Sequence, residues 1–423
     1  MGQQLYCDNA DYSRSARPLA EGSADRLRSP GVVDVLGLVL LTAIIVTPIR
    51  VALYLEVGGA YLHVEEVLQL GLMALAAIRV FSGEWRGRRG ELLSVGIIAG
   101  AIVGTQVATD RIPTSSVALQ QARSFLPFVT AILVLLAPWS ISRRTVVLAV
   151  CGGIATSATL ASLIHSLFRE HLQVMAVDHE LLDIAIIGGR MYWSSLVSSI
   201  LAPLVIIYSG RRSCCFAAVT MCVVLTAIVL SQSRSVLLGF GIATMFCFTI
   251  RGVAPRRVAV MVAILGVAGA LMAAGLMAES EWELLWRRLG IHDFEGEFER
   301  AFELGRVPLY EQYWSAIAQA PISGLGLGHP VAFSPLGGAH YSADISVVHI
   351  MVPLGCVGGS ALVWFVVVSA RRACGGCRLD KGLRACVWML LLAACMSLNQ
   401  DPFFRSQFPI AFAFILSASS VRG

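Results

Sequence analysis

Long runs of apolar residues constrain what this chain can fold into more than any other feature. Of its 423 residues, 57% are hydrophobic and only 14% are charged, and the mean hydropathy is +0.74. Soluble domains are about half apolar and about a quarter charged, whereas about 20 apolar residues cross a bilayer as a helix. The composition therefore excludes a soluble enzyme, a disordered chain and a secreted disulfide scaffold, and it predicts an all-α, polytopic membrane protein of about 12 transmembrane helices. The runs cover residues 33–55, 60–81, 91–109, 120–139, 145–167, 190–209, 214–232, 235–250, 257–277, 344–369, 384–399 and 406–421.

Arginines in the short connections orient the predicted spans. If the N-terminal tail is cytoplasmic, every inner connection carries at least two basic residues and every short outer connection carries at most one. This is the bias that the positive-inside rule describes. The inner connections are 82–90, 140–144, 210–213, 251–257 and 370–383. We therefore predict a multi-pass protein of the inner (plasma) membrane with both termini in the cytoplasm.

The predicted spans divide the chain into four parts. These are a cytoplasmic tail (1–30), spans one to nine (31–277), a large extracytoplasmic loop (278–343) and spans ten to twelve (344–423). A second outer connection, 168–189, joins spans five and six. Within the large loop, apolar side chains recur at helical spacing over 306–320, which predicts a helix there. Glycines from 324 to 328 do not have the spacing of a nucleotide-binding loop, and a turn with close backbone approach explains them.

Four arginines lie at the predicted outer face, where a charge must be solvated, paired or functional. They are Arg190, Arg234, Arg306 and Arg405. A guanidinium group offers a planar fork of five donors that matches phosphate oxygens, so several of them converging would suit a diphosphate at the bilayer surface. An interfacial anchor is the alternative for each. We interpret Arg405 as an anchor and Arg234 as functional, because the short turn around Arg234 needs no charge for orientation. For Arg190 and Arg306 both interpretations stay open.

A histidine marks the point where the large loop enters span ten. His340 is expected at the outer aqueous boundary, and an unperturbed pKa of about 6.5 suits a general base. Asp344, one helical turn later, could orient or polarise it; a polar residue at a helix entrance is the alternative. Near the outer start of span two, His63, Glu65 and Glu66 could cap the helix, pair with the arginines or touch an acceptor sugar.

Other site chemistries find no support in the sequence. The 11 cysteines fall almost entirely in apolar runs or arginine-rich loops, which argues against a disulfide framework. No zinc-binding helix motif or cysteine–histidine cluster occurs, so we expect no metal and no other cofactor. The net charge of +5 comes from arginines scattered in loops, which does not indicate a nucleic-acid partner.

Several of these pieces, taken in order, resemble one known family. Residues 306–328 resemble the R…W…P-x-x-G-x-G signature of the O-antigen ligase and Wzy-type polymerase superfamily. Residues 339–341 and 353–358 are similar to its H-N-x-x-L…L-G-x-x-G stretch. Ser233-Arg234 matches an S-R-G/A junction, and Arg190 matches an arginine before the sixth span. The resemblance covers roughly 185–360, and the order, spacing and membrane side of the pieces carry it.

The resemblance implies a fold and an activity. Members are GT-C-like, all-helical membrane glycosyltransferases of about twelve spans that act on the extracytoplasmic side. Their donor is a polyprenyl-diphosphate-linked oligosaccharide, their acceptor is a glycan or a lipid-linked glycan, and they need no metal. A ligase transfers to the lipid A core of lipopolysaccharide, whereas a polymerase transfers to another glycan; both stay open here.

The resemblance also implies roles for individual residues. His340 would be the base that activates the acceptor hydroxyl. Three arginines would bind the donor diphosphate and stabilise the leaving group: Arg190, Arg234 and Arg306. Beyond what the resemblance implies, we also expect Tyr341 and Asp344 to bind substrate. Tyr341 stands where the family has asparagine, which bears on acceptor positioning, and Ser235 stands where the family has glycine or alanine.

The main alternative is a transporter or flippase for an anionic lipid-linked glycan, since twelve spans and outer arginines would suit it too. Against it, the sequence shows neither inverted repeats nor paired helices broken by glycine or proline. The single large outer loop also carries the motif. A structural membrane subunit is a third reading, and it predicts that His340 and Arg306 tolerate alanine.

Overall fold

Helices make up most of the structure, as the sequence predicts. The computed structural model describes residues 31–47, 54–57, 60–82, 89–109, 115–178, 186–187, 190–191, 214–230, 240–241, 275, 306–329, 332–333, 339–340, 346–374 and 408–418. The helices are α1 (Val32–Val46), α2 (Val64–Ser82), α3 (Arg89–Thr109), α4 (Ser115–Leu136), α5 (Arg143–Asp178), α7 (Cys214–Leu230), α12 (Arg306–Gln319), α13 (Ser346–Cys374) and α15 (Phe408–Ser417). The all-α class is therefore confirmed for the described part of the chain.

In the part of the chain that the structure describes, three short antiparallel hairpins lie between these helices, and the sequence did not predict them. Their strands are β1 (Tyr54–Val57) with β2 (Ala60–His63), β3 (Ile186–Ile187) with β4 (Arg190–Met191), and β5 (Ala332–Phe333) with β6 (Ala339–His340). Because β2 ends at His63, the predicted span 60–81 is helical only from Val64.

Two predicted boundaries are wrong. The first span was predicted to reach residue 55, but α1 ends at Val46 and Thr47 is extended. Pro48 follows, and a proline disfavours helical backbone in the residue before it. The fifth span was predicted to end at 167, but α5 continues to Asp178 through half of the expected outer connection 168–189. Its 36 residues make a helix about 54 Å long, well beyond the roughly 30 Å of hydrocarbon in a bilayer.

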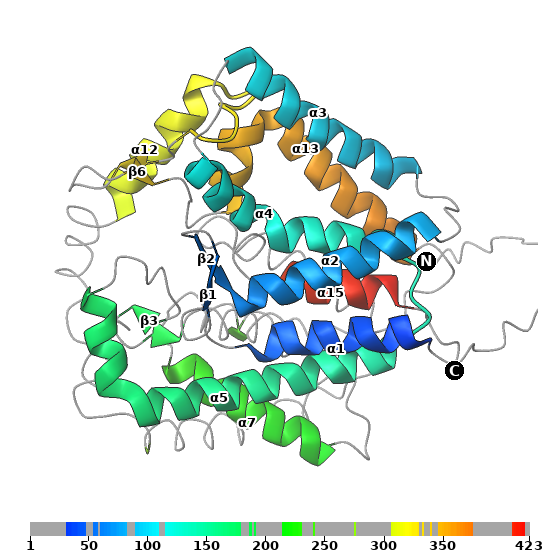
Figure 1. The fold of residues 1–423 in the computed structure, drawn as a ribbon, viewed down its shortest axis with the longest axis vertical. Coiled ribbons are helices and arrows are strands. Elements are labelled where there is room, and N and C mark those ends of the chain that lie inside the picture. The colour runs from blue at the N-terminus through cyan, green and yellow to red at the C-terminus, as the bar shows by residue number, and fades with distance from the viewer. Residues whose placement is uncertain are drawn as a thin grey trace, which may run out of the picture.

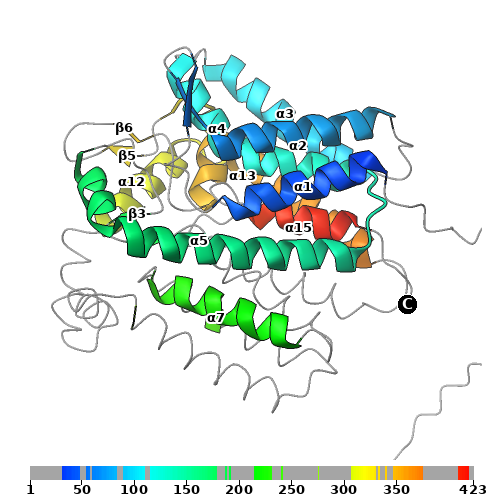
Figure 2. The same ribbon diagram turned by 60° about the horizontal axis from the view of Figure 1, so that its bottom comes forward.

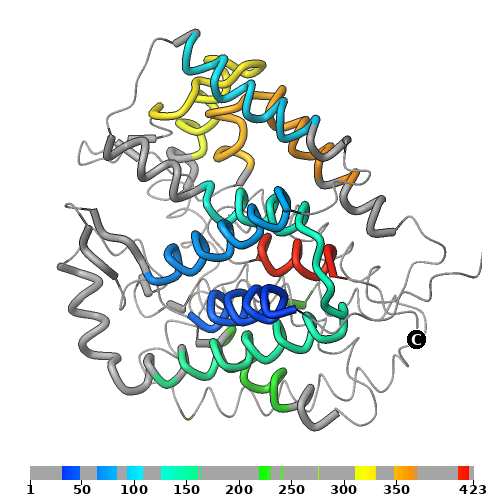
Figure 3. Tube along the Cα trace, turned by 45° about the vertical axis from the view of Figure 1, so that its right-hand side comes forward, coloured from blue at the N-terminus to red at the C-terminus, as the bar shows by residue number. Residues whose placement is uncertain are grey.

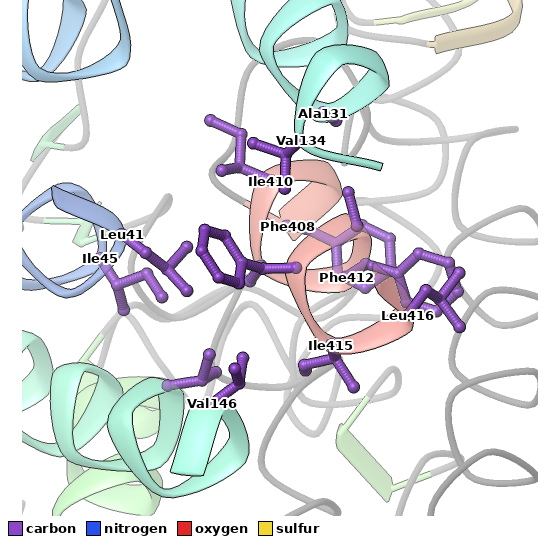
Figure 4. Close-up of a cluster of buried hydrophobic side chains, with 14 of the residues drawn as sticks. Leu41, Ile45, Ala131, Val134, Val146, Phe408, Ile410, Phe412, Ile415 and Leu416 are labelled. Carbon is purple, nitrogen blue, oxygen red and sulfur yellow. The ribbon is translucent and has the colours of Figure 1, made fainter. Parts of the chain in front are cut away.

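The main bundle is built around α15. All residues from Phe408 to Leu416 are buried, as expected for a helix that is apolar on every side. Figure 4 shows its side chains enclosed by Leu41 and Ile45 of α1, Ala131 and Val134 of α4 and Val146 of α5. Helix α2 packs on α1 and α4, and α7 packs on α5 (Figures 1 and 3). The sequence predicted a span here but not that it would be the central helix.

A polar cluster ties helix ends together at one end of this bundle. Asp34, near the start of α1, pairs with Arg79 near the end of α2 and accepts from the amide of Ser140 between α4 and α5, at 3.1 Å. The Arg143 side chain, at the start of α5, donates to the carbonyl of Ile415 near the end of α15. Thus α1 and α5 run in one direction, and α2, α4 and α15 run in the other. Which end faces the cytoplasm stays a prediction.

A second group of helices forms around α13. Helix α3 lies along α13. Helix α12, drawn in yellow in Figure 1, also packs on α13. The apolar contact between α12 and α13 is a small buried cluster of Tyr313, Ala316 and Ile317 with Val348 and Val352. This contact places the helix that begins at Arg306 against the helix that follows His340.

Membrane spans can be tested only on the described helices. Among them, the segment Val347–Phe365 of α13 is long and apolar enough to cross a bilayer, and four other apolar helices are shorter. Large apolar side chains also point outward, among them Val32, Phe81 and Val107, which are 76–85% exposed. Such side chains suit a lipid-facing surface. The count of twelve spans, the GT-C-like arrangement and the placement of the large loop stay predictions. So do the spans 190–209, 235–250, 257–277 and 384–399 and the tail 1–30, which lie wholly or almost wholly outside the described residues.

Candidate functional site

A turn after α12, residues 320–329, inserts into a break in helix α13. The break centres on Gly355, whose φ of 59° and ψ of −166° are not helical. Pro353 precedes it and lacks the amide that a continuous helix needs. Helix α13 is therefore one helix broken by glycine and proline, whereas the sequence argument against a transporter concerned paired helices of this kind.

Backbone groups of the turn replace the hydrogen bonds that the break removes. In a continuous helix the amides of Cys356 and Val357 would donate to carbonyls four residues earlier. Here Cys356 donates to Pro321 at 2.8 Å, and Val357 donates to Ile322 at 3.2 Å. In return, the freed carbonyl of Val352 accepts from Leu325 at 2.6 Å. We refer to this set of bonds as the turn–helix joint.

Glycines let the two backbones approach this closely. Gly324 has a φ of 78°, and a Cβ atom built there would lie 2.6 Å from the amide nitrogens of Leu354 and Gly355. A Cβ atom at Gly355 would collide with the carbonyl of Ile322. The prediction of a turn with close backbone approach over 324–328 is thus confirmed. The two glycine-containing motif pieces, 321–326 and 353–358, turn out to be one structural unit.

The elements that carry two predicted site residues lie next to each other. Arg306 is the first residue of α12, and His340 lies in β6, where it pairs with Ala332 of β5. The β5–β6 hairpin contacts α12. His340 has a strand backbone, and α13 begins at Ser346, close to the start at residue 344 that the sequence predicted for span ten.

The other described candidate arginine lies in a separate hairpin. Arg190 pairs with Ile187, and the β3–β4 hairpin contacts α5 and α7. Figures 1 and 2 show β3, β6 and α12 on the same side of the molecule, the left in both views. Arg234, Tyr341 and Asp344 lie outside the described residues, as does Arg405, so their contribution stays a prediction.

The acidic pair at the start of α2 is buried. Glu65 is 1% and Glu66 is 4% exposed. Glu65 accepts from the Gln69 side chain at 2.8 Å within the same helix, and His63 ends strand β2 opposite Tyr54. The structure therefore assigns Glu65 a contact inside α2. The other roles that the sequence left open for this segment stay predictions.

Two residues of α3 contact the turn, and sequence analysis missed them. The Gln106 side chain donates to the carbonyl of Leu327 at 2.8 Å, and the Thr105 hydroxyl lies 3.0 Å from the carbonyl of Ser323. The available signal was an amide side chain inside an apolar run, because a polar group in a membrane helix needs a partner. Within the described part of the chain, no group of three His, Cys, Asp or Glu side chains could hold a metal ion. Independence from metal stays a prediction.

Comparison with known families supplies the deciding observation. Residues 216–363 match the family model described as O-antigen ligase. We refer to this matched segment as the O-antigen ligase domain. The resemblance to the O-antigen ligase and Wzy-type superfamily is thereby confirmed. No curated protein matches the chain.

The O-antigen ligase domain contains the turn–helix joint, α12 and the β5–β6 hairpin, so both Arg306 and His340 lie in it. The family consists of integral inner-membrane proteins with a glycosyltransferase-like ligase or polymerase activity on lipid-linked glycans. Arg190 and helix α3 lie outside the matched segment. Whatever they add to the site comes from parts of the chain that the family model does not cover.

Proposed function

We propose that this chain transfers a polyprenyl-diphosphate-linked glycan to an acceptor hydroxyl on the extracytoplasmic face of the inner membrane. The observation that carries the proposal lies inside the O-antigen ligase domain. There, the helix that begins at Arg306 contacts the hairpin that holds His340, and the turn–helix joint anchors the segment between them. The proposed base and the proposed phosphate ligand are thus carried by adjoining elements.

The proposed chemistry needs one proton transfer and one displacement. His340 takes the proton of the acceptor hydroxyl, and the acceptor oxygen forms a bond to the anomeric carbon of the donor glycan. The bond from that carbon to the diphosphate breaks, and polyprenyl diphosphate leaves with the electron pair. Fixed guanidinium groups offset the charge that develops on the leaving group. We assign this role to Arg190, Arg234 and Arg306.

The acceptor distinguishes two forms of the reaction. A ligase uses a lipid-linked glycan, the lipid A core, whereas a polymerase uses another glycan chain. We assign Tyr341 and Asp344, which flank the proposed base in sequence, to the acceptor side of the site. The proposal includes no metal, because the guanidinium groups supply the positive charge that a metal would otherwise provide.

The break in α13 bears on the transporter alternative. Transporters aim the free amides of a broken helix at an anionic substrate. In α13 the amides of Cys356 and Val357, which begin the second half of the helix, donate to the carbonyls of Pro321 and Ile322 instead. This helix end is occupied by the protein's own backbone, which favours a structural joint over an anion site and supports the transferase.

The test uses purified protein in detergent with a polyprenyl-diphosphate oligosaccharide as donor, with and without a lipid A core acceptor. We expect His340→Ala to lower turnover by about 100- to 10,000-fold, the usual contribution of a general base. The control is His171→Ala, a histidine of α5 outside the O-antigen ligase domain, which should transfer at the wild-type rate.

The products separate the alternatives. Transfer to the core identifies a ligase, and a ladder of products without it identifies a polymerase. If His340→Ala kept full turnover, the base assignment would be wrong although the transferase function stood. If the wild type transferred to neither acceptor and proteoliposomes took up the donor, the chain would be a transporter.

A further inference from the structure

We propose that Thr105 and Gln106, at the C-terminal end of α3, are positioning residues for glycan transfer. They hold the 320–329 turn, and through it they set where Arg306 and His340 stand. The inference rests on the proposed function. It also assigns a role to a helix that lies outside the O-antigen ligase domain.

The contacts are two side-chain bonds to backbone carbonyls of the turn. The Gln106 amide nitrogen donates to Leu327 at 2.8 Å. The Thr105 hydroxyl lies 3.0 Å from the Ser323 carbonyl and 2.6 Å from the Ala101 carbonyl of its own helix, so its one proton serves the two acceptors. Thr105 is buried, at 6% exposure. Both bonds join segments more than 200 residues apart in sequence.

The turn has a glycine where α3 comes closest. Gly326 is buried and has a φ of 80°. A Cβ atom there would lie 3.1 Å from the Gln106 amide nitrogen and 3.4 Å from the Thr105 methyl carbon. This spacing leaves little room for a side chain between the turn and the end of α3.

The turn is hydrogen-bonded on two sides, to α13 and to α3. Pro321, Ile322 and Leu325 bond to the break in α13. Ser323 and Leu327, which lie between and beyond them, face α3. Because α3 also packs along α13, the turn is enclosed by two helices that are themselves in contact. The bonds to one helix therefore oppose rotation of the turn about the other.

The orientation of the turn matters because it lies between the two proposed functional elements. Helix α12 runs directly into it, and strand β5 begins shortly after it. A small rotation would move the start of α12 and the β5–β6 hairpin by different amounts. A misplacement of about 1 Å can cost about 100-fold in rate. The apolar packing of α3 on α13 does not depend on these two bonds, so their loss should lower the rate before it affects folding.

The experiment compares Gln106→Leu and Thr105→Val with wild type in the full-length protein. Thr105→Ser keeps the hydroxyl and tests rescue. Thr159→Val is the matched control, because the Thr159 hydroxyl donates to Ala155 inside α5 at 2.8 Å and makes no bond to the turn. For each variant we measure kcat and KM with a polyprenyl-diphosphate oligosaccharide, thermal unfolding, and hydrogen exchange of peptides that cover 320–329.

We expect kcat to fall about 10- to 100-fold in Gln106→Leu and Thr105→Val, with KM changed less than about threefold. Exchange in the turn should become faster, and the unfolding temperature should stay close to that of wild type. Thr105→Ser and Thr159→Val should behave like wild type in every measurement.

Three results would overturn the proposal. The first is wild-type kcat in both variants. The second is a loss of activity that follows a matching loss of thermal stability. The third is unchanged exchange at 320–329. If the wild type itself transferred no glycan, the proposed function would fail and the catalytic role of these residues with it. The exchange result would then show separately whether α3 holds the turn.

Discussion

The backbone amide of Leu325 donates to the carbonyl of Val352 over 2.6 Å, and this bond fastens the turn after α12 to helix α13. In an unbroken helix that carbonyl would accept from Cys356, which donates to Pro321 instead. The two segments have therefore exchanged partners, and every bond of the exchange is made by backbone. The joint depends on conformation and on space, which are properties that a glycine substitution tests directly.

Gly355→Ala should disrupt the turn–helix joint. The backbone of Gly355 lies in a region that is essentially restricted to glycine, and a Cβ atom would collide with the Ile322 carbonyl. We expect a loss of about 1–3 kcal/mol in the free energy of unfolding, or more, measured by thermal unfolding in detergent. Gly359→Ala in the same helix is the control, because its Cβ atom would meet neighbours at an ordinary 3.4 Å and 3.5 Å. Equal losses in the two variants would contradict the geometry.

Gly37→Ala should destabilise the main bundle. A Cβ atom at Gly37 would be forced into the Trp139 ring, which packs on Phe414 of α15 with ring centroids 4.4 Å apart. Overpacking of this kind costs about 1–3 kcal/mol. Gly152→Ala, in α5, has no atom within 4 Å of the added carbon, so alanine should be neutral or stabilise the helix by about 0.5–1 kcal/mol. A Gly37→Ala protein that unfolds at the wild-type temperature would show that α1 and α15 are not packed as described.

Asp34→Asn should weaken the polar cluster that ties helix ends together. The Asp34 carboxylate pairs with Arg79 and accepts from the amides of Gly31 and Ser140 at 3.0 Å and 3.1 Å. Loss of the charge should cost about 1.5–3 kcal/mol, the range for hydrogen bonds to charged groups. Adding Arg79→Gln should cost less than it does alone, because the first change has already removed its partner. Strictly additive unfolding free energies would argue against the pair.

Arg306→Ala should lower turnover by about 100- to 1,000-fold if its guanidinium group stabilises the leaving diphosphate. Arg306→Lys should recover only part of the rate, because an ammonium group is a point charge without the planar fork. Initial rates at saturating acceptor would measure both. Arg144→Ala, an exposed arginine at the start of α5, is the control. An Arg306→Ala enzyme as fast as this control would remove Arg306 from the site.

Much of the helical fold could be predicted from sequence, because a membrane helix must be an apolar run of a certain length. The runs at 91–109, 214–232 and 344–369 appear as α3, α7 and α13 with ends shifted by a few residues. The hairpins could not be predicted, since strands of two to four residues leave no periodic signal. The central position of α15 could not be predicted either, because lipid and a protein core favour the same apolar side chains.

The candidate site divides in the same way. The helix predicted over 306–320 is α12, and the order of the motif pieces in the sequence indicated the family that the comparison matches. The joining of residues 320–329 to α13 could not be predicted, because backbone bonds impose no side-chain pattern apart from glycines. The partners of Thr105 and Gln106 could not be predicted for the same reason, because these partners are carbonyl groups, which every residue has.

The contact of α3 with backbone carbonyl groups of the turn has a consequence for how the sequences of related chains diverge. Because α3 contacts Ser323 and Leu327 only through their backbone oxygens in the bonds described, selection on this joint acts on the glycines and on two polar residues of a distant helix. The two bonds from α3 place no requirement on the side chains at 323 and 327. Related chains can therefore keep the same architecture here while their turns share little sequence beyond glycine, and substitutions in α3 should be the more informative record of common descent.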